Sequence, residues 1–286
     1  MLWKRRHALG RAALRSGVSR LGLPRGGLVA LHSSLGSLGW VEGGEEAVLD
    51  AFQEAIGPEG TLMAPTFTQC FAPGPHGLPA RQGAFDLLRT PSALGRISEA
   101  LRQRPGAVRS LHPIHSAAAV GPLAEDLAQD HERTSDFGAS TPFGRLIAWN
   151  GTIVLLGVGQ FANSSLHAVE DMLDMPYLRE AVALVASPGS GGTARFFCRK
   201  CPIGDRDFYR QTGSKWDAAM RAAGLVRFGR LGSAEVQTME AKPFAQEAIA
   251  LLEREPDLLL CDRPQCAFCV WAKGRLRKVG IGSTRP

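Results

Sequence analysis

Apolar and polar positions alternate along the chain with two different periods, which predicts strands that alternate with helices. Short apolar runs at 28–32, at 61–65 and from Thr152 to Gly157 are typical of buried strands. Longer stretches with apolar residues on one face predict amphipathic helices. We expect these helices at 4–21, 44–56, 90–103, 122–131, 214–223 and 243–254. The alternation predicts an α/β fold with a central mixed sheet flanked by helices.

The last third of the chain has a more antiparallel pattern. Val182–Ala186 and Arg195–Phe197 flank a stretch rich in glycine and proline at 188–192, which indicates a hairpin. Residues 225–236 form a further strand-like stretch between two predicted helices. We therefore expect the C-terminal portion of the fold to be more antiparallel than the N-terminal portion.

The net charge of +6 is concentrated at the N-terminus. Residues 1–41 carry seven basic side chains and no acidic one, so the rest of the chain is close to neutral and is not expected to bind nucleic acid. The basic stretch fits the solvated face of the helix at 4–21, attraction of an anionic ligand such as a nucleotide-bearing cofactor, or a targeting arm. We expect a single domain over 1–286, with a cysteine-bearing C-terminal portion at 180–275.

The hydrophobic content and the length of the apolar runs indicate in which compartment the protein is expected. Hydrophobic residues make up 44% of the chain, enough for a sizeable core. No run approaches the roughly 20 apolar residues that span a bilayer, and no secretory leader is recognisable. We therefore expect a cytoplasmic protein that binds no membrane and keeps its thiols reduced. The oligomeric state is open, with a homodimer as one alternative.

The stretch that follows the strand from Thr152 carries the main candidate for catalysis. Asn163, Ser164 and Ser165 are good N-cap residues, which places His167 in the first turn of a helix. The acids at 170 and 171 are three and four residues further on, on the same helix face as the histidine. A neutral histidine oriented by a carboxylate can accept a proton. A plain surface pair is the alternative.

A loop rich in small residues follows the strand at 28–32 and precedes the helix at 44–56. Its hydroxyl groups and backbone amides could bind a phosphate or another part of a ligand. The loop matches neither a P-loop nor a dinucleotide-binding fingerprint, so a plain connection is the alternative. The candidate binding residues are Ser33, Ser34, Gly36 and Ser37.

His112 and His115 are close in sequence and could in principle bind a metal ion together. Pro113 stands between them and favours an extended segment, in which the two rings would diverge. We therefore expect a hydrogen-bonded structural role for at least one of the two histidines.

Five of the six cysteines form two groups with spacing typical of metal ligands, Cys198-x-x-Cys201 and Cys261-x4-Cys266-x-x-Cys269. Such pairs suit a tetrahedral structural zinc ion. The predicted ligands are Cys198, Cys201, Cys266 and Cys269. Reduced cysteines without a metal are the alternative, because the gap between the groups is long and five thiols exceed the four that zinc needs.

Six short blocks stand in a fixed order along the chain. They are His32 to Trp40, Gly57 to Leu62, Thr90 to Gly95, Arg109 to Ser116, Ser140 to Leu146 and Leu155 to Glu170. Together, over about residues 15–270, they resemble the aminoglycoside 3-N-acetyltransferase family of antibiotic N-acetyltransferases. The family usually has threonine where Ser165 stands here, so a hydroxyl is kept.

The resemblance implies transfer of an acetyl group from acetyl-CoA to an amine, on a fold of the family's own rather than the common GNAT fold. It implies that His167 and Glu170 act in catalysis. The residues expected at coenzyme A are Ser33, Ser34, Gly36, Ser37, His112, Ser116 and Thr141. A polycationic aminoglycoside needs an acidic pocket, for which Asp136, Asp171 and Asp174 are the candidates, with Glu42 as a further one.

Two other functions are compatible with the same residues. One is an acyl-CoA-dependent transferase that acts on another small amine in biosynthesis. The other is a protein that binds coenzyme A without turnover. Release of coenzyme A in the presence of a panel of amines would separate an enzyme from a binding protein.

Overall fold

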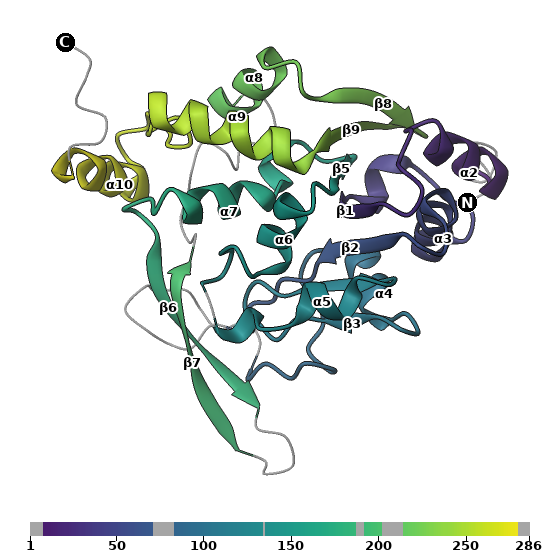
Figure 1. The fold of residues 1–286 in the computed structure, drawn as a ribbon, viewed down its shortest axis with the longest axis horizontal. Coiled ribbons are helices and arrows are strands. Elements are labelled where there is room, and N and C mark those ends of the chain that lie inside the picture. The colour runs from purple at the N-terminus through teal and green to yellow at the C-terminus, as the bar shows by residue number, and fades with distance from the viewer. Residues whose placement is uncertain (1–7, 71–82, 134, 187–191, 202–213, 280–286) are drawn as a thin grey trace.

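The main sheet of the protein has its parallel strands at the centre. The computed structural model describes residues 8–70, 83–133, 135–186, 192–201 and 214–279. Within these ranges, seven strands form one mixed sheet in the order β3-β4-β2-β1-β5-β9-β8 (Figure 1). They are β1 (Leu28–Ser33), β2 (Thr61–Pro65), β3 (Val108–Arg109), β4 (Ala117–Val120), β5 (Thr152–Leu156), β8 (Arg227–Leu231) and β9 (Ala234–Glu240). β1 pairs in parallel with β2 and β5, whereas β4 and β9 pair antiparallel at either side.

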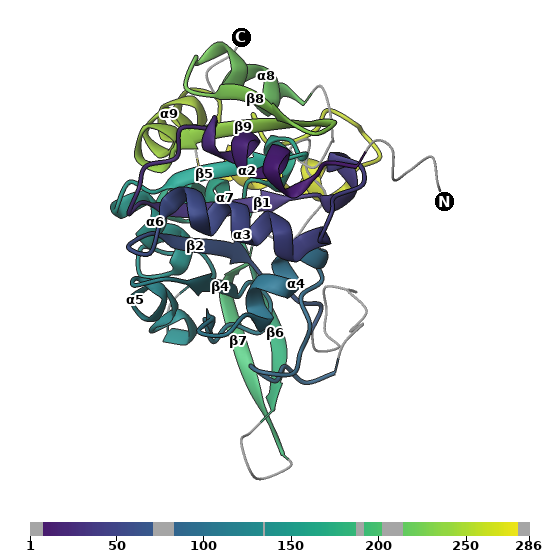
Figure 2. The ribbon, with the colours of Figure 1, turned by 90° about the vertical axis from the view of Figure 1, so that its right-hand side faces the viewer.

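Helices cover both faces of this sheet. One face carries α2 (Arg11–Ser19), α3 (Gly44–Ile56) and α4 (Arg96–Gln103), and the other carries α5 (Ala124–Ala128), α6 (Pro142–Ala148), α7 (Ser165–Met172) and α9 (Ala241–Arg254). Figure 2 shows α2 and α3 in front of the central strands. Successive side chains of a strand point to opposite faces, so Leu28 and Ala30 pack with the second helix layer and Val29 and Leu31 with the first.

A second, two-stranded sheet projects from the body. β6 (Arg179–Ala186) and β7 (Thr193–Cys201) form this antiparallel hairpin, as the sequence pattern predicts (Figure 1). The remaining helices among the described residues are α8 (Lys215–Ala222) and α10 (Ala267–Lys278). The prediction of a mixed α/β sheet with a more antiparallel C-terminal part is confirmed.

Two predicted helices begin later than expected. The N-terminal helix begins at Arg11, since Leu9 forms a strand-like bridge with Val41; residues 4–7 lie outside the described residues. The helix predicted from Thr90 begins only at Arg96, because the Thr90 hydroxyl accepts a hydrogen bond from the amide of Asp86 instead of capping a helix.

The stretch predicted as one strand at 225–236 is a hairpin. β8 and β9 meet at a turn that contains Gly232, whose φ of 60° favours glycine. A β-carbon at this position would lie 2.5 Å from the carbonyl oxygen of Leu38. None of the described helices combines the length and the apolar character that crossing a membrane requires.

Candidate active site at the carboxyl ends of the parallel strands

His167 and Glu170 form a buried pair on the helix that follows β5. The chain leaves β5 through a short 3₁₀ turn, η3 (Gln160–Ala162), and α7 begins after Ser164, so His167 lies in the first turn as predicted. Its Nδ1 atom is 2.6 Å from Oε2 of Glu170, and both side chains are buried. An ionised carboxylate only accepts hydrogen bonds, so Nδ1 carries the proton and the lone pair of a neutral ring is on Nε2.

A second histidine joins the end of β1 to the start of α7. Nε2 of His32 accepts a hydrogen bond of 3.1 Å from the backbone amide of Ser164. Burial, and secondly the charge of His167, lower the pKa of His32 to about 3. His32 therefore stays neutral and does not add a positive charge beside His167. His32 had no predicted role, although its position at the end of a buried strand, directly before the serine-rich loop, is a usable signal.

Aromatic rings enclose the His167 side chain. The ring centroid of Phe137 lies 4.9 Å from that of His167, and Phe143 lies 5.1 Å from Phe137. Phe67 packs edge-on against both phenylalanines and against His115. These rings exclude water from the histidine and fix its orientation, and a low local dielectric strengthens its bond to Glu170.

Asp136 is the centre of a second buried polar group. It contacts His112 at 3.3 Å and His115 at 2.5 Å, and the thiol of Cys198 also donates a hydrogen bond to it. Burial would raise the pKa of Asp136, but the charges and hydrogen bonds of the two histidines outweigh burial and hold this pKa well below its ordinary value. The distance of 2.5 Å between His115 and Asp136 fits a hydrogen bond, and Asp136 is thereby held as a carboxylate.

His131 completes this group from the opposite side. Its ring stacks on that of His112 at 4.6 Å, and its nitrogens bond to the Ser110 hydroxyl and to the backbone carbonyl of Asp136, both at 2.8 Å. Burial first, and the charge of His112 second, hold the pKa of His131 well below its ordinary value. The expectation that the rings of His112 and His115 diverge is wrong: they lie 5.8 Å apart at 27°, since both face Asp136.

Four residues that were expected at ligands are buried and have structural contacts in this fold. Asp136 has no exposed surface, and its carboxylate oxygens face His112, His115 and Cys198. Nδ1 of the equally buried His112 accepts a hydrogen bond from the backbone amide of His115, and its Nε2 faces Asp136. The hydroxyl of Ser116 bonds to Arg109 and Thr66, which ties β3 to the end of β2.

Thr141 is the fourth of these residues and is also fully buried. It is the N-cap of α6: its hydroxyl accepts a hydrogen bond from the amide of Gly144 and donates one to the carbonyl of Gly138. The hydroxyl proton of Thr141 is thereby committed to the fold, so this side chain has no donor left for a ligand.

A groove of about 1120 Å³ lies beside the serine-rich loop. Ser33, Ser34 and Gly36 line it, together with residues from the N-terminal ends of α3 and α4. The Ser33 hydroxyl is buried and has no hydrogen-bond partner within the described part of the chain. His167 is not among the lining residues, but the groove reaches the direct neighbour of His32.

Hydrogen bonds of Ser37 fix the serine-rich loop to the end of β5 and to the β8–β9 turn. The Ser37 hydroxyl donates to the carbonyl of Gly157 at 2.9 Å and lies 2.9 Å from the hydroxyl of Ser34. The hydroxyl of Ser233 donates to the carbonyl of Ser37 at 2.7 Å. Of the four predicted loop residues, three line the groove, and Ser37 instead fixes the loop to the end of β5.

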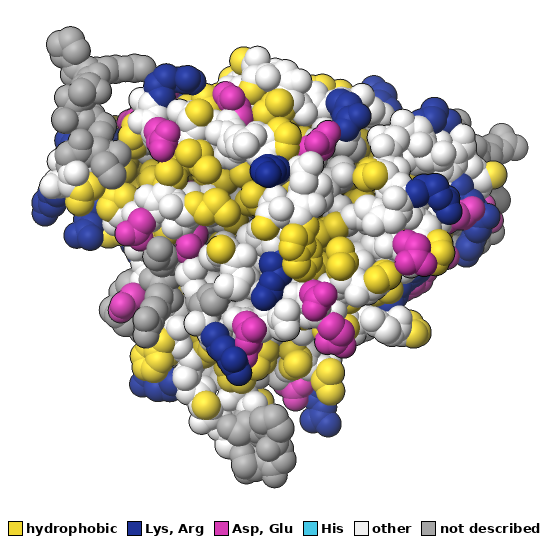
Figure 3. All heavy atoms as spheres, in the orientation of Figure 1, with side chains coloured by type: hydrophobic (Ala, Val, Ile, Leu, Met, Phe, Trp, Pro, Cys, Tyr) yellow, Lys and Arg dark blue, Asp and Glu magenta, His cyan; other side chains and the backbone are white. Residues whose placement is uncertain are grey.

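The acidic residues near these features differ in exposure. Glu42, Glu45 and Glu46 line the groove, where Glu45 is paired with Arg96 at 2.8 Å. Asp171 is half-buried and Asp174 is exposed, and neither of them lines the groove. On the face shown in Figure 3, basic and acidic side chains are interspersed.

The predicted zinc ligands do not come together as expected. Cys198 contacts Asp136 and packs with Ile114 and Ala181, whereas Cys266 and Cys269 pack with α10 in a separate cluster. The side chain of Cys201 lies outside the described residues. The predicted set of four cysteine ligands is therefore corrected. Among the described residues, the cysteine whose sulfur lies near those of Cys266 and Cys269 is Cys261, which the prediction left out.

Fold and site together define an α/β protein with a histidine–carboxylate pair at the carboxyl ends of its parallel strands, an arrangement that can remove a proton from a nucleophile. The chain belongs to the aminoglycoside 3-N-acetyltransferase family, whose sequence model matches residues 30–253. The family resemblance drawn from the six blocks is thereby confirmed.

Individual relatives cover most of the chain. It is 34% identical over 266 residues to aminoglycoside N(3)-acetyltransferase VII of Streptomyces paromomycinus, which covers 86% of this chain and 92% of that protein. The crystal structure of apo AAC(3)-IVa, an aminoglycoside acetyltransferase, is 27% identical with a TM-score of 0.78 over 93% of this chain and 96% of that one. A histidine-to-alanine mutant of AAC(3)-IVa in complex with a gentamicin matches with a TM-score of 0.77, at the same identity and coverage.

Proposed function

We propose that the protein transfers an acetyl group from acetyl-CoA to an amino group of an aminoglycoside, with His167 as the general base. The observation that carries this proposal is the 2.6 Å bond between Nδ1 of His167 and Glu170 in the first turn of α7, in a chain of this family. The pair supplies a proton acceptor whose orientation is fixed before the substrate arrives.

The chemistry follows from the lone pair on Nε2. His167 takes a proton from the amine nitrogen as this nitrogen forms its bond to the thioester carbonyl carbon, and the carboxylate of Glu170 stabilises the imidazolium that forms. An acceptor that arrives as an ammonium ion first releases its extra proton to solvent. When the tetrahedral intermediate collapses, the carbon–sulfur bond breaks and the thiolate of coenzyme A takes up the proton. A neutral His32 helps here, since a second positive charge would disfavour the imidazolium.

Ser165 is the better of two candidates for stabilising the oxyanion of that intermediate. Its hydroxyl is fully buried two residues before His167 and has no hydrogen-bond partner within the described part of the chain. Thr141 is the second candidate hydroxyl, but its proton is committed to the carbonyl of Gly138. A donor that is held ready for developing charge is worth about 10²–10³ in kcat.

The groove beside the serine-rich loop is the proposed site for coenzyme A. Ser33 and Ser34 offer hydroxyl groups to a polar chain, and Gly36 keeps the surface open, since nothing lies within 4 Å of the position of its absent β-carbon. Cofactor contact of these three residues is a prediction of the family resemblance that the position of the groove supports.

The acceptor class rests on charge and on the relatives. Since Asp136 is buried, Asp171, Asp174 and Glu42 are the remaining predicted acids for a polycationic substrate. The AAC(3)-IVa mutant was solved with a gentamicin, an aminoglycoside, which favours this class over other amines.

The test is release of free coenzyme A, followed with a thiol reagent, from acetyl-CoA and a panel of aminoglycosides and simple amines. Mass spectrometry of the products should show one added acetyl group on aminoglycosides. Turnover with simple amines alone would favour a biosynthetic transferase. Binding of acetyl-CoA without turnover of any amine would favour a non-catalytic binding protein.

A further inference from the structure

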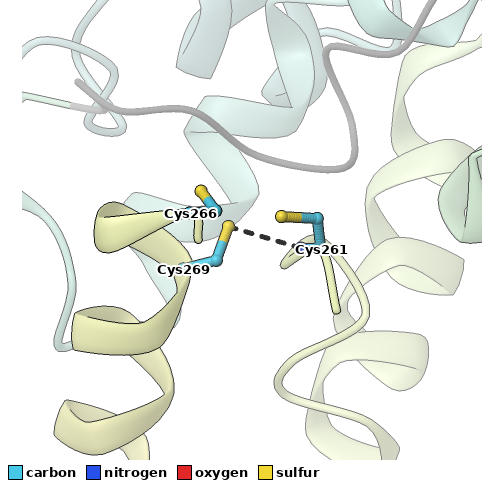
Figure 4. Close-up of side chains that lie close together, drawn as sticks. All are labelled: Cys261, Cys266 and Cys269. Atoms are coloured by element: carbon cyan, nitrogen blue, oxygen red, sulfur yellow. Dashed lines mark hydrogen bonds between the residues drawn. The ribbon is translucent and has the colours of Figure 1, made fainter. Parts of the chain in front are cut away.

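Three cysteine side chains meet where the chain enters its last described helix. Cys261 lies in the segment before α10, Cys266 is the N-cap of α10 and Cys269 is in its first turn. All three are buried, and their sulfur atoms lie within 4.8 Å of one another. Figure 4 shows them around one common space between the start of α10 and the preceding segment.

Two features of the surroundings suit sulfur that is bound to a metal, although burial raises the pKa of the free Cys269 thiol. The backbone amide of Cys261 donates a hydrogen bond to Sγ of Cys269 at 3.3 Å, which favours negative charge on that sulfur (Figure 4). Cys266 and Cys269 stand at the amino end of a helix of 12 residues, where the helix dipole favours anions. Thiolates buried so close together would need a cation to balance their charge.

We propose that Cys261, Cys266 and Cys269 bind a structural Zn²⁺ ion. Thiolate ligands select zinc among the common divalent ions. Zn–S bonds of about 2.3 Å in a tetrahedron place neighbouring sulfurs about 3.8 Å apart, so the three thiols need only small side-chain shifts to take up this geometry. These cysteines supply three ligands, and tetrahedral zinc takes a fourth. The cobalt spectrum described below shows whether the fourth ligand atom is sulfur, oxygen or nitrogen.

The site lies where the C-terminal helix meets the segment that leaves α7. Cys266 and Cys269 pack with Met175 and Tyr177, a few residues beyond the last residue of α7. In the same contact region, Nε of Arg275 donates to the carbonyl of Pro176 at 3.3 Å, and the Arg179 guanidinium lies 4.2 Å from the centre of the Trp271 ring. A bound ion would therefore hold α10 against the segment that leaves α7, without contacting His167.

Metal analysis of the full-length protein, purified without chelator, is the first measurement. The expected result is about one zinc per chain. A content below about 0.2 zinc per chain overturns the proposal, as does a disulfide between any two of these cysteines in protein purified without reductant. Replacement of zinc by Co²⁺ should produce thiolate-to-cobalt charge-transfer absorption, and the ligand-field bands distinguish a fourth sulfur donor from an oxygen or nitrogen donor.

Matched serine variants test the ligand assignment. Cys261→Ser and Cys269→Ser should each lower the zinc content at least about fivefold and lower Tm. Cys198→Ser is the control, because it removes a buried thiol that the earlier four-cysteine set included but this set does not; it should keep its zinc. Zinc that is lost from Cys198→Ser, or kept by both other variants, would overturn the assignment. If a variant does not fold, the cobalt spectrum of the wild-type protein still decides whether thiolates bind the metal.

Discussion

Nε2 of His32 accepts a hydrogen bond from the amide of Ser164, and this bond joins the carboxyl end of β1 to the first turn of α7. The serine-rich loop starts directly after His32, and the proposed base lies three residues after Ser164. The neutral imidazole of His32 therefore fixes the position of the proposed coenzyme A loop relative to the proposed base, His167.

His32→Gln tests how this buried ring responds to pH. Since the pKa of His32 is about 3 in the fold and about 6.5 in an unfolded chain, the unfolded state binds more protons between these pH values. The stabilising contribution is therefore complete above about pH 6.5 and is lost as the pH falls towards 3. Glutamine can still accept from the Ser164 amide but does not titrate. The dependence of unfolding free energy on pH should become shallower in this window, by up to about 1.4 kcal/mol per pH unit.

Urea unfolding at a series of pH values measures this effect. The variant keeps His131, whose pKa is also lowered, so part of the pH dependence should remain. An unchanged slope would mean that His32 is protonated in the folded protein.

Glu170→Gln tests the orientation and charge of the proposed pair. Removal of the carboxylate charge disfavours the imidazolium of His167, so the acid limb of the profile of kcat/KM against pH should move to lower pH while kcat falls. His167→Ala, the reference variant, should lower kcat by about 10²–10⁴-fold and leave the affinity for acetyl-CoA unchanged. Near-wild-type turnover of His167→Ala would rule out the proposed base, and an unmoved acid limb would rule out the proposed role of Glu170.

Ser165→Ala tests the proposed oxyanion donor. Loss of one such donor should lower kcat by about 10²–10³-fold with little change in KM for either substrate. Ser165→Thr is the matched control, because it keeps the hydroxyl and should keep most of the activity. If steady-state kinetics show the same kcat for the alanine variant and the wild type, the hydroxyl does not contact the intermediate.

Asp136→Asn tests whether this acid serves stability rather than substrate binding. Each hydrogen bond to a charged group is worth about 1.5–3 kcal/mol, and Asp136 accepts one from His115 and one from Cys198, while Nε2 of His112 lies 3.3 Å from it. The variant should therefore unfold several kcal/mol more easily in urea. Asp174→Asn is the control, since Asp174 is exposed, and at its φ of 47° asparagine is well tolerated; it should change stability by at most about 0.5 kcal/mol. Weaker aminoglycoside binding by Asp136→Asn with unchanged stability would restore Asp136 as a substrate ligand.

Contacts between near neighbours in the sequence could be predicted, because helix geometry fixes them. The spacing of His167 and Glu170 places them on one face of any helix, and the structure has them bonded. The helix at 44–56 agrees to the residue, because an apolar stripe and Gly57, with a φ of 75°, define it.

Contacts between distant residues could not be predicted in this way. The sequence made Asp136 a candidate acid of a substrate pocket, whereas the fold places two histidines and Cys198, which is 62 residues away, around it. The same limit misplaced the cysteines: spacing alone paired Cys198 with Cys266 and Cys269, whereas packing in three dimensions selects Cys261. Contacts between distant residues depend on the tertiary fold, and the local pattern of apolar and polar residues does not contain this information.

The bond from Ser233 to the carbonyl of Ser37 spans 196 residues of sequence. Through this bond the β8–β9 turn supports the serine-rich loop, which lies near the N-terminus of the chain. Natural variation at that turn, where a side chain on Gly232 would strike the backbone at Leu38, can shift the loop without altering any residue that faces a ligand. In comparisons of sequences within this family, substitutions in the β8–β9 turn and in the serine-rich loop should therefore be considered together.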